Sequence, residues 1–224
     1  MFNNMKRNLR DMFRTCEENL LTTQKLLEEQ RKYQIVKKQL LNEQEQNEIL
    51  FKKANYDNLT QIFNRQAFEI NIHETIAGYD DSDLGALFVI DVDNFKSVND
   101  TLGHQGGDEV LKALALCLKN TLADCGFAGR WGGDEFVGFI SNAPNIHFIR
   151  NKASDLCSLM NRQFLFKGIL HHISISIGVC PMKKNDELGV AYEHADMMLY
   201  EVKKMGRNNF KIYLNSNESY EFKE

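Results

Sequence analysis

Proline is nearly absent from this chain, and glycine is absent from its first third. Of 224 residues only two are Pro, and the first of the 14 Gly is Gly78. Because Pro and Gly are the residues that interrupt helices, nothing of that kind occurs in the first 77 residues. The composition, 43% hydrophobic, excludes a collagen-like fibre and a wholly disordered chain. The chain therefore has two parts of different kinds.

Paired cysteines and long apolar runs are also missing. The five Cys include no CxxC pair, and their odd number fits no closed disulfide framework. No apolar run approaches the roughly 20 residues that span a bilayer, and the N-terminal segment lacks the continuous apolar core of a signal peptide. We therefore expect a cytoplasmic protein with reduced thiols. The net charge of −4 argues against nucleic acid as a partner, since proteins that coat nucleic acid usually have a basic face.

Residues 1–55 are predicted to form one long helix. They are rich in Glu, Gln, Lys, Arg and Leu, which are good helix formers. They carry 11 basic and 8 acidic side chains, which leaves the rest of the chain with a net charge of −7. Apolar positions recur at the heptad spacings of three and four. They begin with Phe2, Met5, Leu9, Met12 and Cys16, and one column continues every seven residues through Asn19, Leu26, Tyr33, Leu40 and Asn47.

Two interpretations fit this helix. It is either a solvated amphipathic helix that lies on its own domain or a parallel coiled coil, about 80 Å long, that pairs two chains. Both flanks of the apolar column are polar, and the helix is too long to be covered by one small domain. We therefore favour the coiled coil and expect a homodimer, in which Asn19 and Asn47 would specify the register.

From Tyr56 onwards, strand patterns alternate with helix patterns. Strands are predicted at 86–91, in a hairpin over 127–140, at 172–180 and at 209–214, and helices at 64–78, 107–122, 144–162 and 187–205. Asn64 is the expected N-cap of the first of these helices, Pro144 opens the third and Gly206 ends the last. This alternation predicts an α/β (α+β) fold with a central mixed β-sheet flanked by helices.

Acidic side chains gather at two places in the predicted sheet. Asp91 and Asp93 end a buried strand, and Asp134 and Glu135 follow the Gly-Gly turn of the hairpin. Ligands sit at strand ends in open α/β sheets. Carboxylates from two strands, together with a backbone carbonyl, suit Mg²⁺ and phosphoryl transfer.

Each of these features has a simpler explanation when it is taken singly. A strand-end Asp is often a helix N-cap, and Gly-Gly in a hairpin is usually only a turn. Lys96 alone would be a solvated surface charge, and His104 alone would be a capping or packing side chain. The conjunction of the features is what favours a catalytic site.

Five motifs, in order along the chain, resemble the GGDEF domains of diguanylate cyclases. Residues 130–136 read RWGGDEF, and residues 57–65 resemble the entry motif DxLTxxxNR. The other three are DVDNFKSVNDTLGHQGGD (91–108), SIGV (176–179) and ADMMLYEVKKMGRN (195–208). The resemblance covers about residues 56–214. It implies a palm like that of nucleotidyl cyclases. The sequence pattern places the dimerisation helix 1–55 before this domain and a loose tail, 215–224, after it.

The resemblance implies a reaction and a set of metal ligands. Members of the family condense two GTP into cyclic di-GMP and release pyrophosphate, with Mg²⁺ or Mn²⁺ as cofactor. The metal ligands here would be Asp91, Asp134, Glu135 and the carbonyl of Val92, which would hold two ions in each active site. Asp134 would also deprotonate the attacking 3′-hydroxyl, with Glu135 as a helper, and Lys96 would stabilise charge on the phosphates.

The same resemblance implies which residues bind GTP. Asn99 and Asp108 would bind the guanine edge, with His104 lining the nucleotide site. Lys203 and Arg207 would hold the β- and γ-phosphates. Phe95, Gly132 and Gly133 complete the expected substrate-binding set. The carboxylate of Asp108 can accept hydrogen bonds from guanine N1–H and N2–H, a donor pair that adenine does not offer.

One domain binds one GTP, so the active site would be completed only between two protomers held together by the coiled coil. The arginine and aspartate of the product-binding RxxD motif are both missing, because Ala123 and Gly126 stand in their places. Weak inhibition by the product is therefore expected. The alternative function is a catalytically inactive GGDEF module that binds GTP or cyclic di-GMP and signals through the coiled coil. No sensor module is recognisable, so the upstream partner is not predicted.

Overall fold

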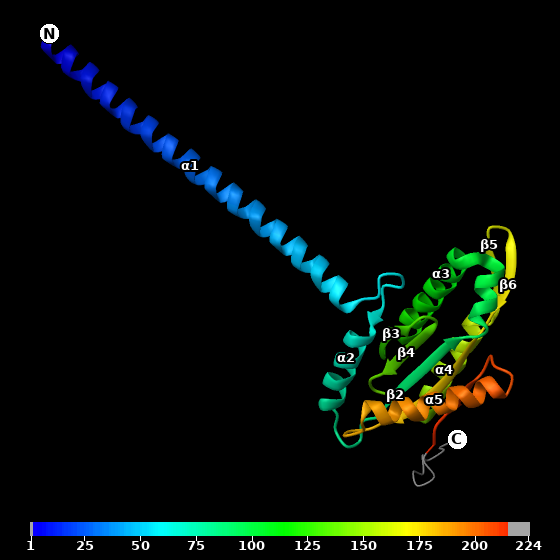
Figure 1. The fold of residues 1–224 in the computed structure, drawn as a ribbon. Helices are drawn as coiled ribbons and strands as arrows, with labels where there is room; N and C mark the ends of the chain where they lie inside the picture. The colour runs from blue at the N-terminus through cyan, green and yellow to red at the C-terminus, as the bar shows by residue number, and fades with distance from the viewer. Residues whose placement is uncertain (1, 215–224) are drawn as a thin grey trace. The chain divides into compact units, whose positions relative to one another are not determined.

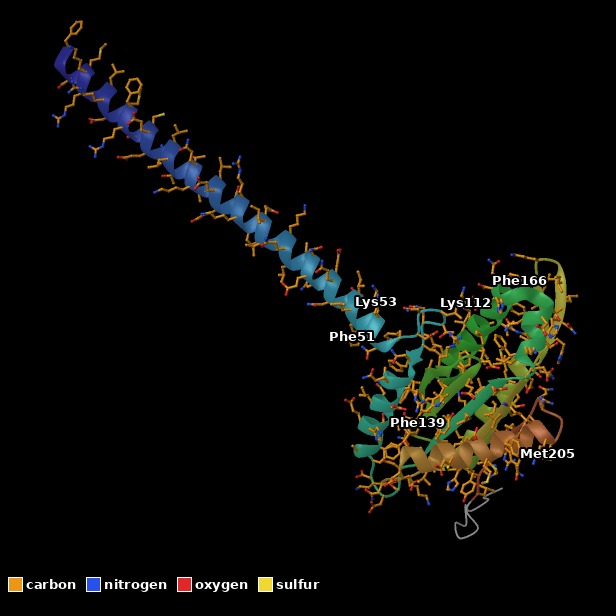
Figure 2. The ribbon with its side chains drawn as sticks, viewed as in Figure 1. Phe51, Lys53, Lys112, Phe139, Phe166 and Met205 are labelled. Carbon is orange, nitrogen blue, oxygen red and sulfur yellow. The ribbon has the colours of Figure 1, made fainter. Side chains whose placement is uncertain are left out.

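The computed structural model describes residues 2–214, and the chain divides into two compact units between Lys52 and Lys53. Helix α1 (Phe2–Asn55) is one uninterrupted helix, which confirms the long helix predicted from the sequence. Side chains stand out along its length in Figure 2. The apolar side chains of the heptad column, among them Leu26, Tyr33 and Leu40, are all exposed.

The second unit is built on a mixed sheet of six strands in the order β1-β3-β4-β2-β7-β8. The pairs β1·β3 and β7·β8 are parallel, and the other neighbours are antiparallel. A central mixed sheet is what the sequence predicted. In sheet order the strands are Phe63–Asn64, Gly126–Gly132, Glu135–Ile140, Gly85–Val92, Ile175–Met182 and Phe210–Ile212.

Four helices cover the two faces of this sheet (Figure 1). They are α2 (Arg65–Ala77), α3 (Phe95–Leu122), α4 (Ile146–Met160) and α5 (Leu188–Lys204). One core cluster joins α3 and α4 to alternate residues of β2, including Phe88 and Ile90. The other joins α2 and α5 to the intervening residues, Leu87 and Val89. Because β2 is covered on both faces, it reads as a continuous apolar run rather than an alternating one.

Helix α3 starts twelve residues earlier than predicted, at Phe95 rather than Gly107. The helical segment before Gly107 was missed because Gly103, Gly106 and Gly107 interrupt the apolar periodicity. Gly103 has a φ of +74° and kinks the helix there. A left-handed φ is readily adopted by Gly, which has no Cβ. Two helical segments of the sequence are thus joined into one bent element.

The region between α4 and β7 also differs from the prediction. Pro144 does not open α4, because Asn145 is the N-cap, accepting from the N–H of Phe148 at 3.0 Å. After α4, strands β5 (Arg162–Phe166) and β6 (Ile169–Ile173) form a hairpin that was not predicted. Its two turn residues, Lys167 and Gly168, have φ values of +47° and +83°, which is the signature of a tight hairpin turn.

The side-chain amide of Asn64 forms hydrogen bonds to the end of α1 and to the first turn of α2. Asn64 caps α2 as predicted, because its Oδ1 accepts from the N–H of Ala67 at 2.9 Å. Its Nδ2 donates to the carbonyl of Ala54, in the last turn of α1, at 2.7 Å. Gly78 is the C-cap of α2, also as predicted.

No helix within residues 2–214 is long and apolar enough to cross a membrane. The tail predicted at 215–224 lies outside the described residues.

Candidate active site

The acidic residues of the two predicted groups meet at one end of the sheet. Asp91, at the end of β2, pairs directly with Glu135, the first residue of β4. On its other side Asp91 pairs with Ser176 of β7. The hairpin between β3 and β4 therefore places Asp134 and Glu135 beside the end of the central strand. The fold thus brings together three of the carboxylates that the sequence assigned to one site.

These carboxylates act on one another electrostatically. The side chain of Asp91 is only 13% exposed, and its Oδ2 lies 2.8 Å from Nζ of Lys203. Burial raises the pKa of Asp91, the ion pair with Lys203 lowers it, and the negative charges of Asp134 and Asp93 raise it further. Burial also raises the pKa of Glu135, and so do Asp91 and Asp134. The site concentrates negative charge that a cation would stabilise.

A divalent cation fits the chemistry of this donor set. Carboxylates are preferred by Mg²⁺ and Mn²⁺, which are usually bound through one or two of them together with phosphate oxygens. Within residues 2–214 no group of three or more His, Cys, Asp or Glu side chains is arranged as a metal site. The ammonium group of Lys203 already lies against Asp91 as a positive charge. The carboxylates therefore match the oxygen ligands that a divalent cation prefers.

Arg130 forms hydrogen bonds to the backbone of the Gly-Gly turn. Its Nε and Nη2 both donate to the carbonyl of Gly133, at 3.0 and 2.7 Å. Its Nη1 lies 3.1 Å from Oδ1 of Asp57, and both side chains are largely buried. Burial alone would raise the pKa of Asp57, but hydrogen bonds from Thr60 and Arg130 outweigh it and lower the pKa. Asp57 and Arg130 both stand in sequence motifs, but the sequence did not predict that they contact each other.

The space in front of the turn is open. A Cβ built on Gly132 or Gly133 would meet no atom within 4 Å, and Gly133 has a φ of +52°. The two glycines therefore allow a ligand to approach the backbone, and the second also permits the turn itself.

An aromatic stack beside the same turn involves side chains of α2 and α5. Trp131 stacks on Tyr192 of α5 with ring centroids 4.8 Å apart, and the guanidinium of Arg65 lies 4.3 Å from the Trp131 ring. Burial raises the pKa of Tyr192 to about 12, so its hydroxyl stays protonated. The stack beside a cavity of about 800 Å³ was not predicted, because its three residues are far apart in the sequence.

The residues predicted to bind guanine lie along the first half of α3. A Cβ on Gly107 would lie 2.0 Å from Oδ1 of Asn99 and 3.2 Å from Cζ of Phe95, so both side chains pack over this glycine. Asp108 is exposed and lines an open cavity of about 490 Å³. The far wall of the cavity includes Phe166 of the β5–β6 hairpin, which Figure 2 labels.

The remaining predicted residues are less tightly placed. Lys96 and His104 are exposed on α3, and within residues 2–214 neither forms a hydrogen bond or ion pair with another of the predicted site residues. Val92 is buried at the end of β2, next to Asp91. Arg207 follows α5 in a short segment where Gly206, Arg207 and Asn208 all have positive φ. Its guanidinium is exposed close in sequence to Lys203.

The mixed sheet flanked by helices carries hairpin carboxylates beside the end of its central strand. The chain belongs to the GGDEF domain family. The sequence model of the family, described as "Diguanylate cyclase, GGDEF domain", matches residues 54–209.

Curated relatives and a solved structure agree with this assignment. The chain is 34% identical over 163 residues to diguanylate cyclase DgcP of Pseudomonas aeruginosa, covering 71% of this chain and 24% of DgcP. It is 34% identical over 177 residues to a diguanylate cyclase of Vibrio cholerae, covering 76% of this chain and 53% of that protein. The chain thus spans about a quarter to a half of these relatives.

The solved structure contains the coiled coil and GGDEF domain of DgcB from Caulobacter crescentus, in complex with c-di-GMP. It superposes with a TM-score of 0.68 at 28% identity, covering 78% of this chain and 94% of that one.

Proposed function

We propose that this chain is a diguanylate cyclase that condenses two GTP into cyclic di-GMP. The observation that carries the proposal is the convergence of Asp91, Asp134 and Glu135 at the end of β2. Lys203 forms an ion pair with Asp91 at this point. In each of the two steps a 3′-oxygen bonds to an α-phosphorus, the bond to pyrophosphate breaks and the 3′-hydroxyl proton leaves. The overall products are one cyclic dinucleotide and two pyrophosphates.

The proposed roles follow from charge and position. Two Mg²⁺ or Mn²⁺ ions, when bound, would neutralise phosphate charge and make the 3′-hydroxyl more acidic. Asp91, Asp134, Glu135 and the carbonyl of Val92 would hold them. Asp134 would take the hydroxyl proton, with Glu135 beside it. Phosphoryl transfer needs positioning and charge neutralisation more than covalent participation by the protein. Carboxylates with bound cations, and Lys203 beside Asp91, would provide both.

The phosphates would be bound by cations from two elements. Lys203, now paired with Asp91, would move to the β- and γ-phosphates together with Arg207 when GTP and its cations enter. Lys96 at the start of α3 would stabilise charge that develops on the phosphates. The Gly132–Gly133 turn would let the nucleotide approach the backbone closely.

Guanine would be recognised by α3. Asp108 would accept from N1–H and N2–H, Asn99 would bind the same edge, and Phe95 and His104 would line the site. Because adenine has no such donor pair, Asp108 would discriminate against ATP. The exposed position of Asp108 in an open cavity is consistent with that role.

Pairing of two chains through α1 would complete the site. Each second-unit domain, proposed to extend over 56–214, offers one set of these residues, whereas the product needs two nucleotides. The exposed apolar column of α1 suits a parallel coiled coil with a second copy. Such pairing would raise the effective concentration of one domain at the other.

The test is turnover of GTP by the purified full chain with Mg²⁺, with the dinucleotide product resolved by chromatography. We expect cyclic di-GMP and pyrophosphate from the native chain and at least 100-fold less product, in order of magnitude, from Asp134→Ala. The control is Asp124→Ala, an exposed Asp outside the site, which should retain activity. If a dimeric native sample binds GTP and forms no product, the chain is the inactive signalling module instead.

A further inference from the structure

Asp93 is the one buried Asp within residues 2–214, with 6% of the residue exposed. It stands two residues after Asp91, in the connection between β2 and α3. Its Oδ1 accepts from the hydroxyl of Ser176 at 2.6 Å, and its Oδ2 accepts from the hydroxyl of Ser174 at 2.6 Å. Oδ2 also accepts from the backbone N–H of Asn208 at 3.0 Å.

A buried carboxylate is unfavourable unless its charge is compensated. No ion pair of Asp93 is found within residues 2–214, so its three hydrogen bonds provide the compensation. Hydrogen bonds to a charged acceptor are about twice as strong as neutral ones. Two of them come from Ser174 and Ser176, side chains of the same sheet region. The third is different, because it reaches the backbone of a loop 115 residues away in the sequence.

That loop has an unfavourable backbone conformation. Gly206, Arg207 and Asn208 have φ values of +112°, +65° and +49°. Two consecutive non-glycine residues in the left-handed region persist only where neighbouring contacts hold them. Two contacts do so here: Arg207 N–H donates to the carbonyl of Val202 at 3.0 Å, and Asn208 N–H donates to Asp93.

We propose that Asp93 is a positioning residue for the triphosphate of the nucleotide. Its carboxylate fixes the backbone on the C-terminal side of Arg207, so that the guanidinium would be held ready for the β- and γ-phosphates. The proposal rests on the proposed function in one respect, the assignment of Arg207 to the β- and γ-phosphates. Through this single buried group, the β2–α3 connection and the loop after α5 keep a fixed separation.

The test compares two nucleotides that differ only beyond the α-phosphate. The full chain with Mg²⁺ is titrated calorimetrically with the α,β-methylene analogue of GTP, which cannot be condensed, and with GMP. Asp93→Asn should bind the GTP analogue about tenfold more weakly, as expected for loss of a charge-assisted hydrogen bond, and GMP within about twofold of the native chain. Asp83→Asn is the matched control, since Asp83 also accepts a backbone N–H, from Asp80 at 2.7 Å, but before the start of β2.

A double-mutant comparison identifies the residue through which Asp93 acts. In an Arg207→Ala background, Asp93→Asn should cause no further loss of affinity for the GTP analogue. Equal losses for both nucleotides, or additive losses with Arg207→Ala, would overturn the proposal, because they indicate a general structural role. If Asp93→Asn does not fold, Ser176→Ala replaces it, with an expected threefold loss, in order of magnitude, for the GTP analogue alone.

These outcomes are separate from those that concern catalysis. A native chain that binds the GTP analogue but makes no cyclic di-GMP contradicts the proposed activity and leaves the comparison of the variants intact. A native chain that binds neither nucleotide contradicts both proposals.

Discussion

At the scale of single residues, Arg130 joins the entry loop to the Gly-Gly turn through one guanidinium group. It donates twice to the carbonyl of Gly133 and pairs with Asp57. Arg130→Ala would release the turn and leave Asp57 largely buried without its cation. We expect kcat to fall by about 10- to 100-fold, since small displacements of reacting groups have effects of this size. Stability should fall by about 2 kcal/mol, measured by thermal denaturation.

Arg130→Lys is the matched control for that substitution. Lysine keeps the charge but cannot bind Gly133 and Asp57 together in the same planar geometry. We therefore expect intermediate activity and stability. An Arg130→Ala protein with native turnover would show that the turn holds its shape without this contact.

The ion pair of Asp57 also predicts a pH dependence. Its pKa in the folded state lies below the usual 3.8 because hydrogen bonds from Thr60 and Arg130 outweigh burial. Ionised Asp57 therefore stabilises the fold above about pH 4, and this contribution is lost as the pH falls through the folded-state pKa. In urea denaturation, Asp57→Asn should be less stable than the native chain at pH 7, and the difference should narrow below pH 4. A difference that is unchanged at pH 3 would contradict this account.

At position 126 the structure has no room for the aspartate of an RxxD product site. A Cβ at this position would lie 1.8 Å from the carbonyl oxygen of Phe139 in the neighbouring strand. That oxygen belongs to the backbone and cannot move aside without breaking the pairing of β3 and β4. We expect Gly126→Asp to lower stability by about 3 kcal/mol or more in a urea titration. Ala123→Arg is the matched control: Ala123 is exposed, so this substitution should leave the stability nearly unchanged.

The missing arginine and aspartate of the RxxD motif, replaced by Ala123 and Gly126, predict how the native chain responds to its proposed product. Cyclic di-GMP added at micromolar concentration should leave the initial rate nearly unchanged. Non-competitive inhibition at that concentration would indicate a second product site elsewhere on the chain.

At the scale of elements, the first half of α3 carries the residues expected to bind guanine, and Gly107 packs against one of them, Asn99. Gly107→Ala should disturb that site without unfolding the helix. The added Cβ would meet Oδ1 of Asn99 at 2.0 Å, and this side-chain end can rotate away. We expect KM for GTP to rise about tenfold, because Asn99 would leave its binding position. The melting temperature should change little, since Ala favours helix over Gly.

Gly189→Ala in α5 is the control for Gly107→Ala. A Cβ at Gly189 would meet no atom within 4 Å, and the residue lies in the first turn of that helix. KM should therefore remain native and stability should rise slightly. If both variants have native KM, Asn99 does not need its present position for GTP binding.

The elements that the sequence predicted well are those with one uninterrupted pattern. Helix α1 has a regular apolar spacing, strand β2 a continuous apolar run and helix α2 a clear N-cap, and all three were confirmed. The start of α3 was missed because Gly103 breaks its periodicity while the chain remains helical on both sides. The β5–β6 hairpin was missed because its outward face carries exposed Leu165 and Leu170, which removes the polar alternation of a strand.

The site was predictable in its residue types but not in its contacts. The spacing of acids in the sequence indicated a cation site, and the structure shows Asp91 opposite Glu135. Local patterns could not reveal the contacts Arg130–Asp57 and Asp93–Asn208, whose partners are 73 and 115 residues apart. Long-range pairs of this kind depend on how the sheet folds, so they become visible only in three dimensions.

At the scale of the whole molecule, turnover should depend on chain concentration. Replacing Leu26 and Leu40 by Lys would place charge in the apolar column of α1 and weaken pairing of two chains. We expect the activity per chain to fall by about tenfold or more at nanomolar concentration and to recover as the concentration rises. Sedimentation should show the matching shift from dimer to monomer.

The control for that double variant is Gln24→Lys, which adds charge at a polar, exposed position on the side of α1 opposite the Leu26–Tyr33–Leu40 column. It should leave both sedimentation and activity native. If the Leu26 and Leu40 substitutions change neither quantity, α1 is not the element that pairs the chains.

The bare apolar column of α1 also bears on how long each molecule survives in a cell. An unpaired helix frays, and frayed segments are where proteases cut. A chain that has found a second copy would bury the column and be protected, whereas a solitary chain would be degraded. If α1 pairs two chains as proposed, that contact would then also set the lifetime of the protein, and single chains would not accumulate.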